Sequence, residues 1–241
     1  MKVAFLIPST TRKRPWRKME DTYLYKIFGQ SFIRTVSDDI EYTIYINIDA
    51  NDPIYTKTIE KNKFIALIGE KATIKFISDG HISKGYLTQM WNYLFRLAYN
   101  DGNDYFYQCG DDIMFQNIDW LSECIKQLKK QKDIGVCGPI NTPNYRILTQ
   151  TLVSRKHWEI FGCYFPPQIK NWWCDDWINY VYSPHYIKKM NHLIAENKGG
   201  EPRYERPNIN DNNAFRNLCL RLTVQGKRRI KDYLDRSLLI L

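Results

Sequence analysis

Four short runs of apolar, β-prone residues alternate with helical segments in the first half of the chain, and this alternation constrains the fold most strongly. The runs are Lys2–Ile7, Tyr42–Ile48, Ala72–Ile77 and Tyr105–Cys109. The first is continuously apolar and the second is rich in β-branched and aromatic residues, as is typical of strands buried inside a sheet. Alternating strands and helices predict a mainly parallel sheet with right-handed crossovers, and therefore an α/β fold.

Segments with helical periodicity separate and follow these strands. The clearest lies between Leu87 and Ala98, where apolar residues recur on one face. Asp119 is expected to cap a helix that continues to about Lys130. Further helices are expected at Glu20–Val36, Thr56–Ile68, Tyr186–Ala195 and from Asn213 to the end, and further strands at Ile134–Ile140 and Thr151–Ser154.

Composition and charge narrow the class of protein. The chain has 241 residues, of which 44% are hydrophobic, enough for the core of one large domain. A net charge of +9 favours an anionic partner: nucleotide phosphate, nucleic acid or an acidic membrane surface. The six cysteines form no C-x-x-C pair, so they are expected to be reduced core thiols. Without a leader or a bilayer-spanning run, the expected location is the cytoplasm.

Acidic residues follow two of the predicted strands. Asp49 and Asp52 come after the second strand, and Asp111 and Asp112 after the fourth. Parallel strands end at one edge of a sheet, where ligands bind, and the basic loop after the first strand ends there too. Carboxylate oxygens suit Mg²⁺ or Mn²⁺, whose other ligands are waters and phosphates. The pattern predicts a site for a nucleotide diphosphate and one metal ion, although an acid pair also fits a plain solvated turn.

A third acid pair, Asp175 and Asp176, lies among three tryptophans in the run Asn171–Trp177. Indole faces pack against sugar C–H groups, and a carboxylate there can take the proton from an attacking hydroxyl. Partial burial raises the pKa of such a base. The tryptophans alone also fit a packed core, whereas a buried carboxylate pair needs partners.

Taken in order, these segments resemble the GT-A glycosyltransferases over about residues 1 to 185. Tyr105–Asp112 is similar to the D-x-D metal motif of that family, with Gly110 in its first position. Asn171–Asp176 resembles the W-x-x-E-D motif of inverting members, with Asp175 in the glutamate position. The other matching segments are Val3–Thr11, the strand ending in Asp49, Lys84–Asn92, and His157–Pro167, which is similar to stretches in glycosyltransferases of large DNA viruses.

The resemblance implies a GT-A fold: a Rossmann-like, mixed, mainly parallel sheet flanked by helices, with a helical C-terminal extension. Within one domain, residues 1–118 would bind the nucleotide sugar, 119–196 the acceptor, and 197–241 form the extension. The implied activity is metal-dependent transfer of a hexosyl or deoxyhexosyl group from a nucleotide sugar, UDP-sugar above all, to a hydroxyl of a glycan or other acceptor. Inversion at the anomeric carbon follows from a general base.

Particular residues take on roles through the same resemblance. Asp112 would bind Mn²⁺ or Mg²⁺, Asp111 would contact the ribose or a metal-bound water, and His185 is a further candidate ligand. Asp176 would be the general base, with Asp175 beside it. The expected donor-binding residues are Pro8, Ser9, Thr10, Thr11, Arg12, Asp49, Lys84, Gly85, Asn92 and Asp111.

Other functions share parts of this pattern. Gly110-Asp111-Asp112 also resembles the metal-binding hairpin of viral RNA polymerases, but 241 residues leave little room for fingers and thumb, so no nucleic-acid partner is expected. A sugar nucleotidyltransferase would carry a glycine-rich loop after the first strand, and Ser9–Pro15 has no glycine. A non-enzymatic binder would have little use for three acid sites. The basic run Lys227–Lys231 allows a weak contact with an acidic membrane or forms a solvated face.

Overall fold

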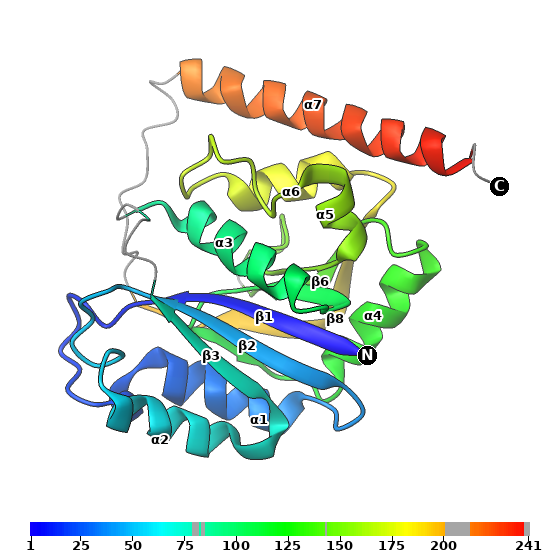
Figure 1. The fold of residues 1–241 in the computed structure, drawn as a ribbon. Helices are drawn as coiled ribbons and strands as arrows, with labels where there is room; N and C mark the ends of the chain where they lie inside the picture. The colour runs from blue at the N-terminus through cyan, green and yellow to red at the C-terminus, as the bar shows by residue number, and fades with distance from the viewer. Residues whose placement is uncertain (79–81, 83–84, 143, 201–212, 239–241) are drawn as a thin grey trace.

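The computed structural model describes residues 1–78, 82, 85–142, 144–200 and 213–238. One eight-stranded mixed sheet has helices on both faces and a long C-terminal helix outermost (Figure 1). Its strands lie in the order β3-β2-β1-β4-β7-β6-β8-β5. The strands are β1 Lys2–Ser9, β2 Glu41–Ile48, β3 Thr73–Ser78, β4 Tyr105–Gln108, β5 Ile113–Phe115, β6 Val136–Ile140, β7 Thr151–Ser154 and β8 Ile187–Asn197.

The first half of the sheet is parallel, as the alternation predicted. β1 pairs with β2 from Lys2↔Glu41 to Ser9↔Ile48, and its other edge pairs with β4. β1 is buried from Val3 onward, which explains its unbroken apolar run. Because β1, β2 and β4 all run in one direction, the residues that follow them meet at one edge of the sheet.

The second half of the sheet mixes directions. β7 runs antiparallel to β4 and β6, β6 is parallel to β8, and the short β5 closes the edge antiparallel to β8. This arrangement makes one continuous sheet from segments before and after the acid pair. It brings the end of β8 next to the turn between β4 and β5, since Lys198 N donates to Asp112 O at 2.9 Å.

Helices cover the two faces of the sheet with separate cores (Figure 1). The π-helix, α1, α2 and α4 pack on one face, around the buried ring of Phe5, and α3, α5, α6 and α7 lie on the other. Burying an aromatic ring of this kind stabilises the fold by about 1.5–3 kcal/mol. The helices are a 3₁₀ turn Met19–Asp21, the π-helix Leu24–Gly29, α1 Gln30–Thr35, α2 Thr58–Ile68, a 3₁₀ turn Gly69–Lys71, α3 Leu87–Asn100, α4 Trp120–Lys130, α5 Arg155–Phe161, α6 Cys174–Tyr182 and α7 Asn213–Leu238.

The terminal helix α7 packs on α5 and α6. A Cβ added at Gly226 would overlap Val181 Cγ2 of α6, so glycine permits the close approach of the two helices. Two cations of the basic run bind the body of the protein: Lys227 Nζ donates to Ser183 O at 3.0 Å, and Arg229 Nη1 to Phe161 O at 3.2 Å. The others, including Arg228 and Lys231, are exposed. In the described part of the chain, α7 and the other helices are too short or too polar to span a membrane.

The helix expected at Tyr186–Ala195 is wrong, because this segment is strand β8. Its pairing with β6 shifts abruptly: Pro139 faces Met190, whereas the next residue, Ile140, faces Ile194. A bulge therefore takes up the intervening residues of β8 and breaks the two-residue alternation of a regular strand. The apolar residues consequently fall at a spacing that mimics a helix.

Two smaller expectations also change. Asp119 precedes α4 but makes no side-chain cap; it adopts φ 56°, and its backbone N donates to Thr35 O at 2.8 Å. Helices α5 and α6 fall where no helix was expected, and α6 carries the third acid pair in its first turn. The six cysteines are free and mostly buried, as expected of core thiols.

Candidate functional site

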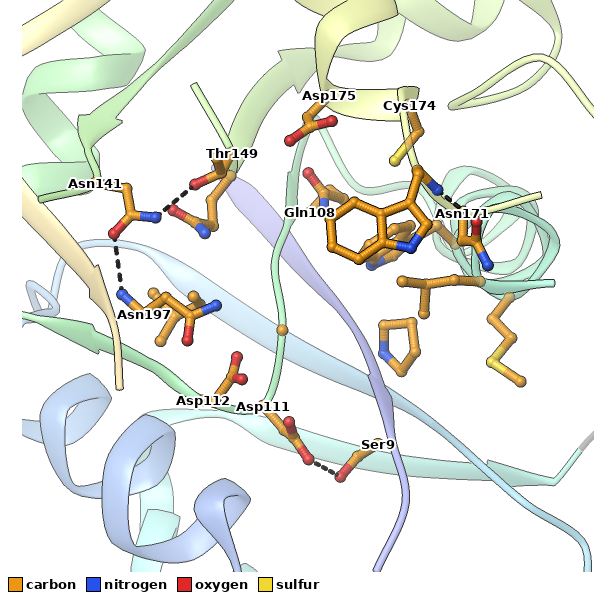
Figure 2. A pocket seen from close by; sticks show the side chains of 18 of the residues that line it. Ser9, Gln108, Asp111, Asp112, Asn141, Thr149, Asn171, Cys174, Asp175 and Asn197 are labelled. Carbon is orange, nitrogen blue, oxygen red and sulfur yellow. Dashed lines mark hydrogen bonds between the residues drawn. The ribbon is translucent and has the colours of Figure 1, made fainter. Parts of the chain in front are cut away.

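A cavity of about 470 Å³ opens at the carboxyl ends of β1, β2 and β4. Residues from both halves of the sheet line it, so acids that are far apart in sequence face one space (Figure 2). Asp111 and Asp112 lie on one side and Asp175 on the opposite side. Its volume falls in the range of small-molecule sites. The lining side chains include Pro8, Ser9, Thr10, Asp49, Trp91, Gln108, Asp111, Asp112, Asn141, Asn144, Thr149, Gln150, Asn171, Trp172, Cys174, Asp175 and Asn197.

A hydrogen-bond chain connects the end of β1 to the acid pair. Ser9 Oγ donates to Asp111 Oδ2 at 2.5 Å and lies 2.9 Å from Tyr55 Oη. Asp111 is fully buried, and burial raises the pKa of Tyr55 well above its ordinary value, with a further rise from the nearby Asp111 carboxylate. Asp111 is therefore held in a fixed orientation at the floor of the cavity.

The loop after β1 is tied to the acids after β2. Thr10 Oγ1 donates to Asp49 Oδ2 at 2.8 Å, and Arg12 Nε lies 3.6 Å from the same oxygen. Asp52 is buried and accepts from Thr11 N at 2.7 Å and Thr11 Oγ1 at 2.6 Å. Asp49 lines the cavity, whereas Asp52 and Thr11 hold the loop in place behind it.

Asp112 is seated between two glycine backbones. A Cβ at Gly110 would lie 2.5 Å from its Oδ1, and one at Gly199 would overlap its Oδ2. The glycine that departs from the D-x-D pattern therefore leaves room for this carboxylate. Carboxylate oxygens that line a cavity suit the hard cations Mg²⁺ and Mn²⁺. Among the described residues, however, no three His, Cys, Asp or Glu side chains gather around one metal position, so phosphates and waters would have to complete the shell.

The third acid pair divides between two environments. Asp175 lines the cavity, and burial followed by repulsion from Asp176 raises its pKa to about 6. Asp176 instead binds Arg146, whose Nη1 lies 2.6 Å from its Oδ1. The same guanidinium nitrogen donates to Tyr180 Oη at 3.1 Å. Asp175 is thus the acid of the pair that faces the cavity, whereas the resemblance to inverting glycosyltransferases implied Asp176 as the general base.

The three tryptophans beside this pair separate as well. Trp172 lines the cavity, Trp177 is buried and donates from Nε1 to Leu222 O at 3.2 Å, and the ring of Trp173 contacts Phe215 edge-to-face. The packed-core interpretation therefore holds for Trp177. Trp172 is the indole of this run that lines the cavity.

Several expected site residues lie away from the cavity lining. Asn92 is fully engaged in structure: its Oδ1 accepts from Tyr164 N and Phe165 N, and its Nδ2 donates to Phe165 O. Gly85, at φ 89°, accepts from Asn171 Nδ2 at 3.1 Å and so supports the lining. His185 precedes β8, whose opposite end, Asn197, lines the cavity, so His185 is far from the acids. Lys84 is outside the described residues.

Neutral amides form much of the remaining wall, and sequence reasoning missed them. They come from strand ends and connecting loops with no shared motif: Gln108, Asn141, Asn144, Gln150, Asn171 and Asn197. Their positions depend on long-range pairing. Asn141 Nδ2 donates to Thr149 Oγ1 at 3.1 Å, and Asn141 Oδ1 accepts from Asn197 N at 3.1 Å (Figure 2).

Comparisons with known proteins support the fold but find no near relative. No family model matches the chain, and no curated protein matches it. Among solved structures, S. aureus TarS 1-349 in complex with UDP-GlcNAc matches with a TM-score of 0.58 at 12% identity, over 83% of this chain and 60% of that one. The UDP complex of TarS 1-349 gives a TM-score of 0.56 at 11% identity, over 81% and 60%. A longer TarS structure gives 0.54 at 10% identity, over 81% and 36%.

These matches establish the architecture. The chain has a mixed α/β fold of the glycosyltransferase type, as the resemblance to GT-A enzymes implied. It spans about 60% of the length of the TarS 1-349 chains that it matches. At 10–12% identity, only the fold is shared.

Proposed function

We propose that this protein is a metal-dependent glycosyltransferase that moves a sugar from a UDP-sugar to a hydroxyl acceptor. The observation that carries the proposal is the common cavity, where Asp49, Asp111 and Asp112 from the parallel half of the sheet face Asp175 from α6. Donor-side acids and a base candidate at opposite walls suit a transfer between two bound molecules. The TarS structures with UDP and UDP-GlcNAc, which share the fold, support the choice of donor.

On the donor side, the chain's own residues bind and orient the nucleotide. Asp49 accepts hydrogen bonds from the base or ribose, and Ser9 and Thr10 lie beside it at the end of β1. Asp112, with Asp111 behind it, would hold Mg²⁺ or Mn²⁺. When bound, such a cation would neutralise the diphosphate and make it a better leaving group. The buried bond from Ser9 keeps Asp111 from swinging away.

On the acceptor side, Asp175 takes the proton from the attacking hydroxyl. A pKa near 6 leaves it ionised at neutral pH and basic enough to accept a proton. Arg146 holds Asp176 outside the cavity, so only one carboxylate of the pair faces the acceptor. Trp172 provides an apolar face for the sugar ring. Direct attack with Asp175 as the base inverts the anomeric carbon.

Nucleotide binding tests the proposal before any acceptor is known. UDP and GDP are added to the protein with and without Mn²⁺, and the melting temperature is measured. We expect UDP with Mn²⁺ to raise it by several degrees, since a ligand at 100 times its Kd stabilises the native state by about 2.7 kcal/mol. No shift with either nucleotide would rule the proposal out.

Asp112→Ala tests the metal assignment within the same assay. The substitution is expected to remove the Mn²⁺-dependent part of the shift and to lower UDP-sugar hydrolysis by at least about 100-fold, with the fold intact. Asp39→Ala is the matched control, because Asp39 is an exposed acid before β2, at the opposite end of that strand from Asp49. Equal effects of the two variants would contradict the role of Asp112.

A further inference from the structure

Neutral polar side chains form much of the wall between the donor acids and Asp175, together with apolar residues such as Trp91 and Trp172. Asn141, Thr149 and Asn197 lie on one side, Asn171 on the other, and Gln108 between them (Figure 2). Amides and hydroxyls both donate and accept, which matches the hydroxyls of a sugar. If a nucleotide diphosphate binds beside Asp111 and Asp112, this wall surrounds the sugar attached to it.

Internal hydrogen bonds hold several of these amides rigidly. Asn171 Oδ1 accepts from Trp172 N at 2.6 Å, and its Nδ2 donates to Gly85 O at 3.1 Å. Asn197 Oδ1 accepts from Gly199 N at 2.9 Å. A wall whose side chains are fixed by the protein discriminates between ligands, because it does not rearrange to accept a different one.

Gln150 adds a polar group that needs a donor. Its side chain is 4% exposed and lines the cavity, and among the described residues its Oε1 has no hydrogen-bond partner. The terminal torsion of glutamine is soft, so the amide of this lining residue can reorient when a ligand enters the cavity. A sugar O–H or N–H can satisfy it, whereas a carboxylate brings only acceptors.

The charges of the lining residues also favour an uncharged sugar. Asp49, Asp111, Asp112 and Asp175 line the cavity, and no Lys, Arg or His does so within the described part of the chain. Arg146, a cation beside α6, is bound to Asp176. A ligand carboxylate between these acids would be repelled and would lack a partner after losing its water.

The geometry points to an uncharged donor sugar: the amide wall accepts a neutral hexosyl group and rejects a uronic acid. This inference rests on the proposed function and specifies its substrate class. Two parts of the cavity would thus recognise two parts of the donor, the diphosphate with its cation and the uncharged sugar. The acids hold the diphosphate end, and the amides and Gln150 select the sugar.

UDP-glucose and UDP-glucuronate form a matched pair of donors, since they differ only in a hydroxymethyl against a carboxylate. The hydrolysis of each donor in the presence of Mn²⁺ is monitored by measuring the UDP that is released. The affinity of the protein for UDP is measured in parallel. We expect kcat/KM for UDP-glucose to exceed that for UDP-glucuronate on the order of 100-fold. Comparable rates, or a preference for the glucuronate, with UDP binding intact would overturn the inference alone. Failure of UDP to bind would instead overturn the proposed function and this inference with it.

Two variants locate the selectivity. Gln150→Met keeps the side-chain volume and is expected to lower kcat/KM for UDP-glucose about 10-fold with unchanged affinity for UDP. Gln225→Met, on the exposed side of α7, is the control and should change neither quantity. Asn144→Lys adds a cation on a half-buried lining residue and should narrow the glucose-to-glucuronate ratio at least about 10-fold. An unchanged ratio in Asn144→Lys, or an unchanged kcat/KM in Gln150→Met, would contradict the assignment.

Discussion

Asp175→Asn should abolish activity and, at the same time, stabilise the protein. Burial first and the neighbouring Asp176 second raise the pKa of Asp175 from 3.8 to about 6. A raised carboxyl pKa means that the unfolded chain releases this proton more readily than the native chain. Stability from this group is therefore present below pH 3.8 and lost as the pH rises through about 6.

The size of the effect follows from the same shift. Each pKa unit corresponds to about 1.36 kcal/mol, so the ionised Asp175 costs at most about 3 kcal/mol of folding free energy above pH 7. The side chain faces the cavity and is half-buried, so water reduces this figure. For 241 residues, with an unfolding entropy of about 0.5 kcal/mol/K, the gain in melting temperature at pH 8 is up to about 6 °C.

The assay compares melting curves of the wild type and Asp175→Asn at pH 8 and pH 4, without metal or nucleotide. The variant should melt higher at pH 8 and almost equally at pH 4, while UDP-sugar hydrolysis with Mn²⁺ falls by 100-fold or more. A variant that melts lower at pH 8, or that differs equally at both pH values, would show that Asp175 is not a destabilised carboxylate. Retained activity would show that it is not the base.

Two further predictions concern the supports of the site. Asp52→Ala should lower the free energy of unfolding in urea by about 3 kcal/mol, because it leaves the buried donors Thr11 N and Thr11 Oγ1 without an acceptor. Asp49→Ala removes a partly exposed acid and should lower it by less than about 1 kcal/mol. Equal losses in the two variants would contradict the buried role of Asp52. Arg146→Met should shift the acidic limb of the pH–rate profile to higher pH, since the guanidinium lowers the pKa of Asp175. A limb at unchanged pH, together with a less stable protein, would show that the role of Arg146 is purely structural.

On these expectations, the ionised Asp175 in α6 lowers the stability of the fold and at the same time serves as the proton acceptor. Two adjacent carboxylates in the first turn of a helix benefit from its dipole, yet one of them is desolvated at the cavity. Arg146 relieves the repulsion only on the outer side, through Asp176. The destabilised Asp175 is then the group with a pKa suited to proton transfer near neutral pH.

The parallel half of the fold could be predicted from the sequence because its signals are local. β1, β2 and β4 are apolar runs whose burial leaves few polar residues within them, and the edge strand β3 alternates polar Thr73 and Lys75 with apolar Ile74 and Phe76. Parallel strands joined by helices all end on one edge, so the acids after β2 and β4 were expected to meet there. The bonds from Ser9 to Asp111 and from Thr10 to Asp49 agree with this placement.

The second half depended on contacts between distant segments. β8 carries a bulge imposed by its pairing with β6, so its apolar spacing mimics a helix. Asp175 lines the cavity, whereas Asp176 is paired with Arg146, about thirty positions earlier in the chain. Asn92 fits a donor-binding pattern in sequence but bonds to the chain around Phe165.

The sequence by itself determined the parallel strands β1 to β4, the edge where they end and the acids that follow them, since local apolar periodicity encodes burial. The tertiary structure decided which carboxylate faces the cavity, where the amide wall stands, and that Asp112 fits between Gly110 and Gly199. Those outcomes depend on side chains brought together from distant segments, and the free energies of such contacts leave no periodic signal in the chain.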